Sequence, residues 1–151
     1  MDPGPWGGLS ADVYCTNDLA FALPDRQWVD RTVYSLEVSA DEERTCSLVV
    51  HRTPLEPGDA LDALVTDALR RAGREKREHE VLHQTCREIA GRPGIDVAMQ
   101  WRGTQSMVYV RQAHLTNAGV WLVFGISGGL EDAQSCDKHL ERLIRTLRLR
   151  T

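Results

Sequence analysis

The stretch from Ile95 to Ile126 reads IDVAMQWRGTQSMVYVRQAHLTNAGVWLVFGI and predicts three consecutive antiparallel strands. In its first part, 95–102, apolar residues alternate with more polar ones, as in a strand with one buried face. Two further strands are expected at 107–115 and 119–126, joined by a turn at 117–119. The segment 120–126 is apolar at almost every position, so we expect apolar side chains on both of its faces.

The rest of the chain adds strands and two helices around this stretch. Further strands are expected at 12–16, 19–23, 31–39 and 45–52. Apolar residues recur at helical spacing from Leu61 to Ala72, which predicts an amphipathic helix with Asp59 as its N-cap and Gly73 at its end. A second helix is expected from about Glu131.

This order of elements predicts one α+β domain at 12–151 after a flexible N-terminal tail at 1–11. The hairpin-like connections favour an antiparallel β-sheet with the two helices packed on one face. The second face would then carry apolar groups beside Gln100 and Gln112. An open sheet face of this kind indicates a partner protein or a second copy of the chain.

Composition excludes several classes of function. The chain has 151 residues, a formal net charge of −4 and a sequence pI near 5.7, so we expect no general attraction for nucleic acid or a membrane surface. Residues 1–10 do not resemble a secretion signal, and the most apolar stretch is too short to cross a bilayer. We therefore expect a cytoplasmic protein without direct membrane insertion. The four cysteines lack metal-site spacing and are interpreted as buried thiols.

The string His79-Glu80-Val81-Leu82-His83 matches the HExxH pattern of zinc hydrolases. On a helix, the two histidines would share one face and bind one Zn²⁺, with Glu80 as general base. On a strand, they would lie roughly 13 Å apart and could not share a metal. A third ligand is not obvious. The sequence leaves the choice between helix and strand open.

A second string, Gly125-Ile126-Ser127-Gly128-Gly129, has the GxSxG form of a nucleophile elbow. In that architecture the catalytic acid and histidine follow on later strands of a large sheet, whereas only one helix is expected after Ser127. We therefore interpret Ser127 as a loop residue between strand and helix. No P-loop or dinucleotide fingerprint is present, and no cofactor is expected.

Several short motifs, spread in order over almost the whole chain, resemble the signature of DcrB-related proteins. They are Phe21-Ala22-Leu23-Pro24, Trp28-Val29-Asp30-Arg31-Thr32-Val33, Ser47-Leu48-Val49-Val50-His51-Arg52, Leu55-Glu56-Pro57-Gly58-Asp59-Ala60-Leu61, Gly91-Arg92-Pro93-Gly94 and Arg111-Gln112-Ala113. The sequence departs from this signature at Tyr34, where the family has Asn, and at His114, where the family has Phe.

Members of that family without a signal peptide resemble the Eag (effector-associated) chaperones of type VI secretion. The resemblance implies a PsbP-like α+β domain that forms a homodimer and has no catalytic activity. Its sheet faces would hold the N-terminal transmembrane segments of a secreted PAAR-containing effector. The chaperone would shield these segments in the cytoplasm until the effector is loaded onto the secretion spike. In this reading 74–80 is a linker and 81–89 a strand.

The expected client-binding residues come from two sources. The resemblance supplies Val33, Ser35, Val49 and Gln112. Strand alternation on the predicted open face adds Val108, Val110, Trp121 and Val123, and Gln100 is placed beside them. For the β-branched residues the alternative is ordinary sheet packing. The alternatives for the whole protein are a DcrB-like binding or assembly role of another kind, and an HExxH zinc hydrolase.

Overall fold

The computed structural model describes residues 13–15, 20–22, 32–39 and 44–150. The chain divides into two compact units, 1–30 and 31–151. In the first unit, β1 (Val13–Cys15) pairs antiparallel with β2 (Ala20–Ala22), which confirms the short hairpin. The predicted tail at 1–11 lies outside the described residues, and a single domain from residue 12 onward stays a prediction.

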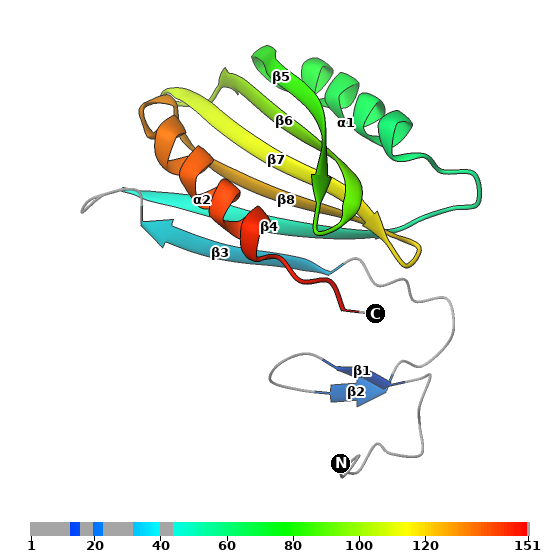
Figure 1. Ribbon diagram of the computed structural model, residues 1–151. Helices are drawn as coiled ribbons and strands as arrows, with labels where there is room; N and C mark the ends of the chain where they lie inside the picture. Colours follow the sequence, from blue (N-terminus) through cyan, green and yellow to red (C-terminus); the bar gives the residue numbers. More distant parts are fainter. Residues whose placement is uncertain (1–12, 16–19, 23–31, 40–43, 151) are drawn as a thin grey trace. The chain divides into compact units, whose positions relative to one another are not determined.

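The second unit is built on one six-stranded antiparallel sheet with the order β3-β4-β8-β7-β6-β5, drawn in Figure 1. Its strands are β3 (Val33–Ser39), β4 (Thr45–Pro54), β5 (Arg77–Ile89), β6 (Arg92–Arg102), β7 (Met107–Asn117) and β8 (Val120–Gly129). The strands predicted at 95–102, 107–115 and 119–126 are therefore confirmed as β6, β7 and β8. The strands predicted at 31–39 and 45–52 are confirmed as β3 and β4, which pair antiparallel.

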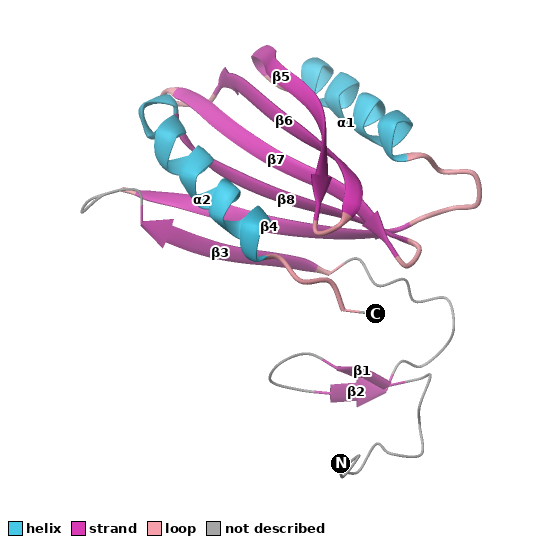
Figure 2. Cartoon of the chain, viewed as in Figure 1, coloured by secondary structure: helices cyan, strands magenta, loops and turns pink. Residues whose placement is uncertain are grey.

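Two helices complete this unit, and they lie on opposite faces of the sheet (Figure 2). Helix α1 (Leu61–Glu75) packs Val65 against Val97 of β6. Helix α2 (Ala133–Thr146), which follows the short 3-10 helix η3 (Leu130–Asp132), packs Leu140 in one cluster with Ala98. Because neighbouring residues of a strand point to opposite faces, Val97 and Ala98 place the two helices on different sides.

The α+β class and the antiparallel sheet are confirmed, but the placement of both helices on one face is wrong. The reason is that the central strands carry apolar side chains on both sides. Residues 94–99 of β6 are all buried, so this strand is not half-buried as its alternation indicated. One helix on each face removes both apolar surfaces from water.

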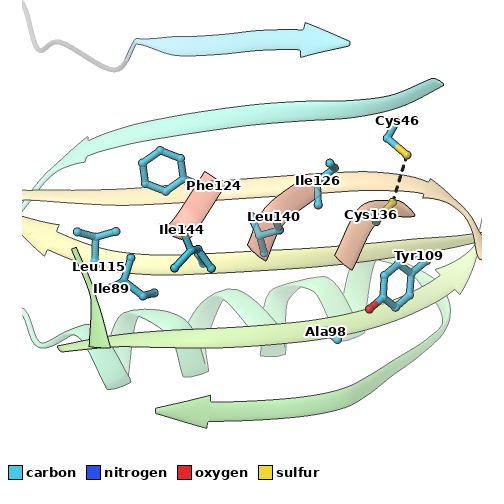
Figure 3. Close-up of a cluster of buried hydrophobic side chains, with 11 residues drawn as sticks. Cys46, Ile89, Ala98, Tyr109, Leu115, Phe124, Ile126, Cys136, Leu140 and Ile144 are labelled. Carbon is cyan, nitrogen blue, oxygen red and sulfur yellow. Dashed lines mark hydrogen bonds between the residues drawn. The ribbon is translucent and has the colours of Figure 1, made fainter. Parts of the chain in front are cut away.

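The larger core lies between α2 and the sheet, where Leu140 and Ile144 of the helix meet Ile126 and Phe124 of β8 (Figure 3). The smaller core lies beneath α1 and centres on Val65. Burying side chains of this size contributes about 1.5–3 kcal/mol each before the cost of ordering them. The two cores hold the sheet rigidly from both sides.

The ends of α1 differ slightly from expectation. Asp59 does not cap the helix, because its side chain accepts a hydrogen bond from the backbone N–H of Glu56 at 2.8 Å, and the N-cap is Ala60. The helix also continues past Gly73 to Glu75. No helix within the described ranges is both long and apolar enough to span a membrane.

Candidate functional site

The α1 side of the sheet is covered by a helix over only part of its width. Helix α1 lies over β5, β6 and β7, while α2 lies on the other face. We call the α1 side of β3, β4 and β8, together with the adjoining residues of β7, the open half-face. It is formed by Val33 and Ser35 of β3, Val49 of β4, Trp121 and Val123 of β8, and Val108, Val110 and Gln112 of β7.

The strand register brings these predicted residues together. In one row across the sheet, Ser35 pairs with Val49, Val49 with Gly125, and Gly125 with Gln112. Paired residues of neighbouring strands project from the same face, so the row lies on one surface. All of the predicted contact residues except Gln100 share this surface.

Gln100 does not belong to the open half-face. It pairs with Tyr109, which packs in the core beneath α2, so Gln100 projects from the opposite side of the sheet. Its amide nitrogen donates a hydrogen bond to Glu80 at 3.1 Å. The expectation that Gln100 and Gln112 lie side by side is therefore wrong.

The open half-face has a buried floor and an exposed rim. Val110 and Val123 are only 5% and 9% exposed, whereas Val33 at the edge strand is 53% exposed. Val49 and Gln112 are half-buried between them. The buried valines pack the sheet, as the alternative interpretation held for them, and the rim residues remain accessible for contact.

A gap in the row of side chains lies at Gly125. A Cβ atom placed there would lie 3.6 Å from Cγ of Gln112 and 3.8 Å from the backbone oxygen of Val49. The backbone of β8 is thus bare between two side chains. Ser127 lies two residues further along β8 and pairs with Val110 of β7. The interpretation of Ser127 as a loop residue is therefore wrong.

A chain of hydrogen bonds runs along the open half-face from β8 to β7. The indole nitrogen of Trp121 donates to Nδ1 of His114 at 3.2 Å, and Nε2 of His114 lies 2.8 Å from Oε1 of Gln112. The two rings lie with their planes 24° apart. Burial lowers the pKa of His114 to about 4, so its ring is neutral at pH 7.

The HExxH segment lies on a strand. His79 and His83 both belong to β5, and they project to different faces. His79 contacts the sulfur of Met99, and His83 lies 3.3 Å from a carboxylate oxygen of Asp96. Because Met99 and Asp96 lie on opposite sides of β6, the two histidines cannot bind one ion together. Among the described residues no group of three or more His, Cys, Asp and Glu side chains is placed to hold a metal.

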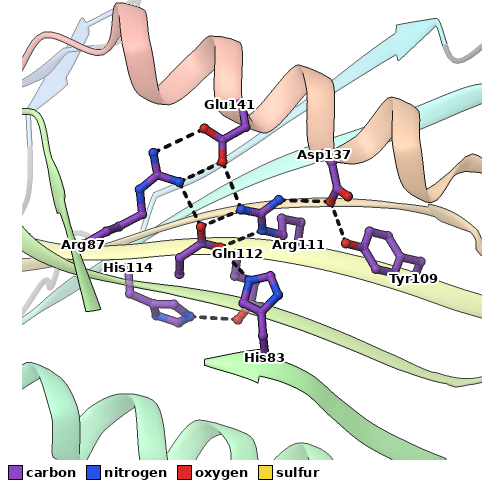
Figure 4. A network of polar contacts seen from close by, with 9 residues as sticks. His83, Arg87, Tyr109, Arg111, Gln112, His114, Asp137 and Glu141 are labelled. Carbon is purple, nitrogen blue, oxygen red and sulfur yellow. Dashed lines mark hydrogen bonds and ion pairs between the residues drawn. The ribbon is translucent and has the colours of Figure 1, made fainter. Parts of the chain in front are cut away.

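Beneath α2, a buried ion pair joins Asp96 of β6 to Arg111 of β7. Figure 4 labels Arg111 with Arg87, Asp137 and Glu141, which belong to the same network. Arg111 also reaches Asp137 and Glu141 of α2, each at 3.0 Å. Arg87 of β5 donates to the carboxylates of Asp96 and Glu141 at 2.9 and 2.7 Å. These contacts fix α2 and the edge strand β5 to the centre of the sheet.

Charge pairing in this network shifts the affinity of its groups for protons. Burial alone would raise the pKa of Asp96, but hydrogen bonds from Arg111 and Arg87 outweigh it and lower the pKa to about 2. The hydrogen bond to Asp96 raises the pKa of Arg111 in turn. Burial also raises the pKa of Tyr109, whose hydroxyl donates to Asp137. All the charges are compensated, so the network is a structural element.

The cysteines are only partly as expected. Cys46 and Cys136 are buried with their sulfur atoms 3.4 Å apart, and burial raises the pKa of Cys136 to about 12. Cys86 on β5 is exposed, which contradicts its interpretation as a buried thiol. The side chain of Cys15 lies outside the described residues.

The antiparallel sheet between two helices has a PsbP-like α+β fold. The chain belongs to the DcrB family, whose model, described as DcrB, matches residues 19–146. None of the curated proteins matches the chain.

Solved structures that share the fold include the following three. PA94 from Pseudomonas aeruginosa, a protein of unknown function, is 17% identical with a TM-score of 0.79, covering 92% of this chain and 96% of PA94. LpqN from Mycobacterium tuberculosis, involved in cell envelope biogenesis, is 8% identical with a TM-score of 0.59, covering 74% of this chain and 68% of LpqN. CyanoP, the PsbP of Synechocystis sp. PCC 6803, is 15% identical with a TM-score of 0.51, covering 76% of this chain and 79% of CyanoP.

Proposed function

We propose that the protein is a non-catalytic chaperone or adaptor that holds an apolar segment of a partner protein on the open half-face. The observation that carries this proposal is a sheet surface on which Val33, Val49 and Val108 are wholly or partly exposed. The amide-bearing Gln112 lies at one end of this surface, and α1 packs mainly on β5, β6 and β7. Membership of the DcrB family is consistent with the proposal.

The chemistry of the surface suits an apolar helix. Valine side chains give a surface from which water is readily displaced, and the bare backbone at Gly125 lets another chain approach closely. A polar group in the middle of such a surface adds specificity, because a partner that leaves it unsatisfied binds less well. Segments destined for a membrane need a surface of this kind while they are in water.

The particular partner that we propose is the N-terminal transmembrane region of a secreted PAAR-containing effector. In this role the protein acts in the cytoplasm, shields the effector's apolar helices and helps to load the effector onto the type VI secretion spike. The motif resemblance to DcrB-related proteins, whose members without a signal peptide resemble the Eag chaperones, supports this choice.

We further propose that the protein acts as a homodimer. Edge strand β3 exposes Val33, Tyr34 and Leu36 by 53%, 54% and 52%. Exposed apolar residues on an edge strand favour association with another chain. Light scattering on the purified protein is expected to give twice the mass of the chain, and a monomer at micromolar concentration would contradict the dimer.

Two substitutions in β3 test the binding surface with a matched control. Val33 and Leu36 are equally exposed but project from opposite faces. We expect Val33→Asp to reduce recovery of the effector when the tagged protein is purified from its host in mild detergent, because it places a charge on the open half-face. Leu36→Asp places the same charge on the same edge strand but on the other face, so it is expected to retain the effector as long as light scattering still gives the mass of the dimer.

The mass and unfolding midpoint of both variants are measured alongside, so that loss of the fold or of the dimer is recognised. Recovery of the effector with Val33→Asp at the wild-type level would overturn the proposed surface. A partner that still binds after its apolar helices are deleted would overturn the proposed function.

A further inference from the structure

The hydrogen-bond chain on the open half-face fixes the orientation of Gln112. The indole N–H of Trp121 can only donate, so Nδ1 of His114, 3.2 Å away, must accept. A neutral imidazole carries one N–H, and that proton is therefore on Nε2. The ring is neutral at pH 7 because burial disfavours its charged form.

The proton on Nε2 in turn decides how the Gln112 amide is turned. Nε2 of His114 donates to the atom 2.8 Å away, and that atom must be the carbonyl oxygen of Gln112. The NH₂ group therefore points away from His114. It lies near the bare backbone position Gly125, where a Cβ atom would be 3.9 Å from it. Within the described residues the NH₂ group has no hydrogen-bond acceptor. Figure 4 shows the His114 ring beside the Gln112 side chain.

We propose that Trp121 and His114 are positioning residues that turn Gln112 so that it offers hydrogen-bond donors, and not its carbonyl oxygen, to whatever binds the open half-face. The inference rests on the proposed function for the nature of that ligand, an apolar segment of a protein. It adds a selection rule. The segment must place an oxygen acceptor, from a hydroxyl side chain or a backbone carbonyl, against Gln112.

The alternative orientation has a different consequence. If the amide were reversed, its NH₂ group would face the N–H of His114, and two donors would meet at hydrogen-bond distance. The carbonyl oxygen would then be offered to the ligand. The ligand would need a donor, which an apolar helix lacks on its backbone because its N–H groups are already used within the helix.

Nitrogen NMR of the free, ¹⁵N-labelled protein at pH 7 tests the orientation without any ligand. We expect His114 to be the Nε2–H tautomer, with Nδ1 unprotonated, and the Trp121 indole proton to be protected from exchange. His114→Phe keeps a ring of similar size and removes both hydrogen bonds, so the Trp121 protection should be lost. An Nδ1–H tautomer, or a doubly protonated ring at pH 7, would overturn the proposal.

Binding of a synthetic peptide tests the selection rule. The probe is a fluorescein-labelled helix of about 20 Leu and Ala residues with terminal Lys, a length that spans a bilayer. Its central residue is O-methylserine, whose ether oxygen accepts a hydrogen bond but has no proton to donate. We expect Gln112→Leu and Gln112→Glu each to weaken binding by about tenfold, because neither offers an N–H donor. Binding that is unchanged or tighter with Gln112→Glu would show that an acceptor is recognised, and would overturn the rule.

The NMR experiment and the peptide-binding experiment test the orientation of Gln112 and the proposed function separately. If the wild-type protein does not bind the peptide, the proposed function is contradicted, while the NMR result still decides how Gln112 is turned. If the peptide binds and His114 is the Nδ1–H tautomer, the proposed function stands and the positioning role is refuted.

Discussion

Replacing Asp96 by Asn tests how much the buried ion network holds the fold together. Asp96 is 4% exposed, pairs with Arg111 and also contacts Arg87. The substitution keeps the size of the side chain and removes its charge. Two guanidinium groups then lose their shared partner, while each keeps a carboxylate of α2.

The expected cost at pH 7 is about 3 kcal/mol of unfolding free energy. Removing one member of a buried ion pair costs about 3–5 kcal/mol, and the remaining contacts of both arginines to Glu141 favour the lower end. The pKa of Asp96 gives an independent figure. Its fall from the usual 3.8 to about 2 corresponds to about 2 kcal/mol of stability at neutral pH.

The same pKa fixes how the cost depends on pH. Because folding lowers the pKa of Asp96, its charge stabilises the fold fully above pH 4 and progressively less as the pH falls toward 2. The wild-type protein loses this contribution on acidification, whereas Asp96→Asn has none to lose. The difference in unfolding free energy between the wild-type protein and Asp96→Asn should therefore be about 1 kcal/mol smaller at pH 3 than at pH 7.

Urea unfolding followed by circular dichroism, at pH 7 and at steps down to pH 3, measures this difference. The matched control is Asp67→Asn on the exposed side of α1, which should change the free energy of unfolding by less than about 0.5 kcal/mol. A cost below about 1 kcal/mol for Asp96→Asn, or a cost that does not change with pH, would mean that the charge of Asp96 does not stabilise the fold.

Three further predictions follow from single contacts. Cys86 should react with Ellman's reagent within the mixing time, while Cys136 should react only on unfolding, because it is buried and its pKa is raised to about 12; equal rates would contradict the structure. Gly94→Ala should lower the free energy of unfolding by about 1–3 kcal/mol in urea titrations, because the added Cβ would lie 2.6 Å from a side-chain carbon and 2.9 Å from a backbone oxygen; a neutral result would argue against this packing. Elemental analysis should find no stoichiometric zinc, because His79 and His83 lie on opposite faces; one zinc per chain that is lost in His83→Ala would reverse that conclusion.

The strands were predictable because alternation and turn residues are local signals. The side of the sheet on which each helix packs was not predictable from the sequence. The apolar stripe of α1 shows which side of the helix is buried, but nothing in it says whether the chain crosses above or below the sheet on its way from β4 to β5. The burial of β6 on both faces, which decides the matter, is visible only once both helices are placed.

The open half-face was largely predictable for the same reason, since residues two apart on a strand share a face. The error at Gln100 arose across a turn. The pairing of β6 with β7 sets Gln100 opposite Tyr109, and the number of residues taken up by the turn between them decides this register. A single sequence does not fix that number.

The polar network and the hydrogen-bond chain were not predicted. Alternation puts Asp96 on the polar side of a half-buried strand, and Arg111 enters the sequence analysis only as part of a family motif. It is α2, from a distant part of the sequence, that buries both side chains and supplies the other partners of Arg111. His114 was noted as a departure from the family motif. Its role between Trp121 and Gln112 depends on cross-strand register that only the folded sheet reveals.

Site-specific photo-crosslinking at two adjacent positions of β3 shows which face of the sheet a partner occupies. Ser35 and Leu36 are both exposed neighbours on β3 and project from opposite faces of the sheet. A photoreactive residue is introduced at either position in the host cell. We expect a crosslink from position 35 to the apolar N-terminal segment of a secreted effector, and no crosslink from position 36. Equal crosslinking from both positions, or crosslinks from position 35 only to polar regions of a partner, would contradict it.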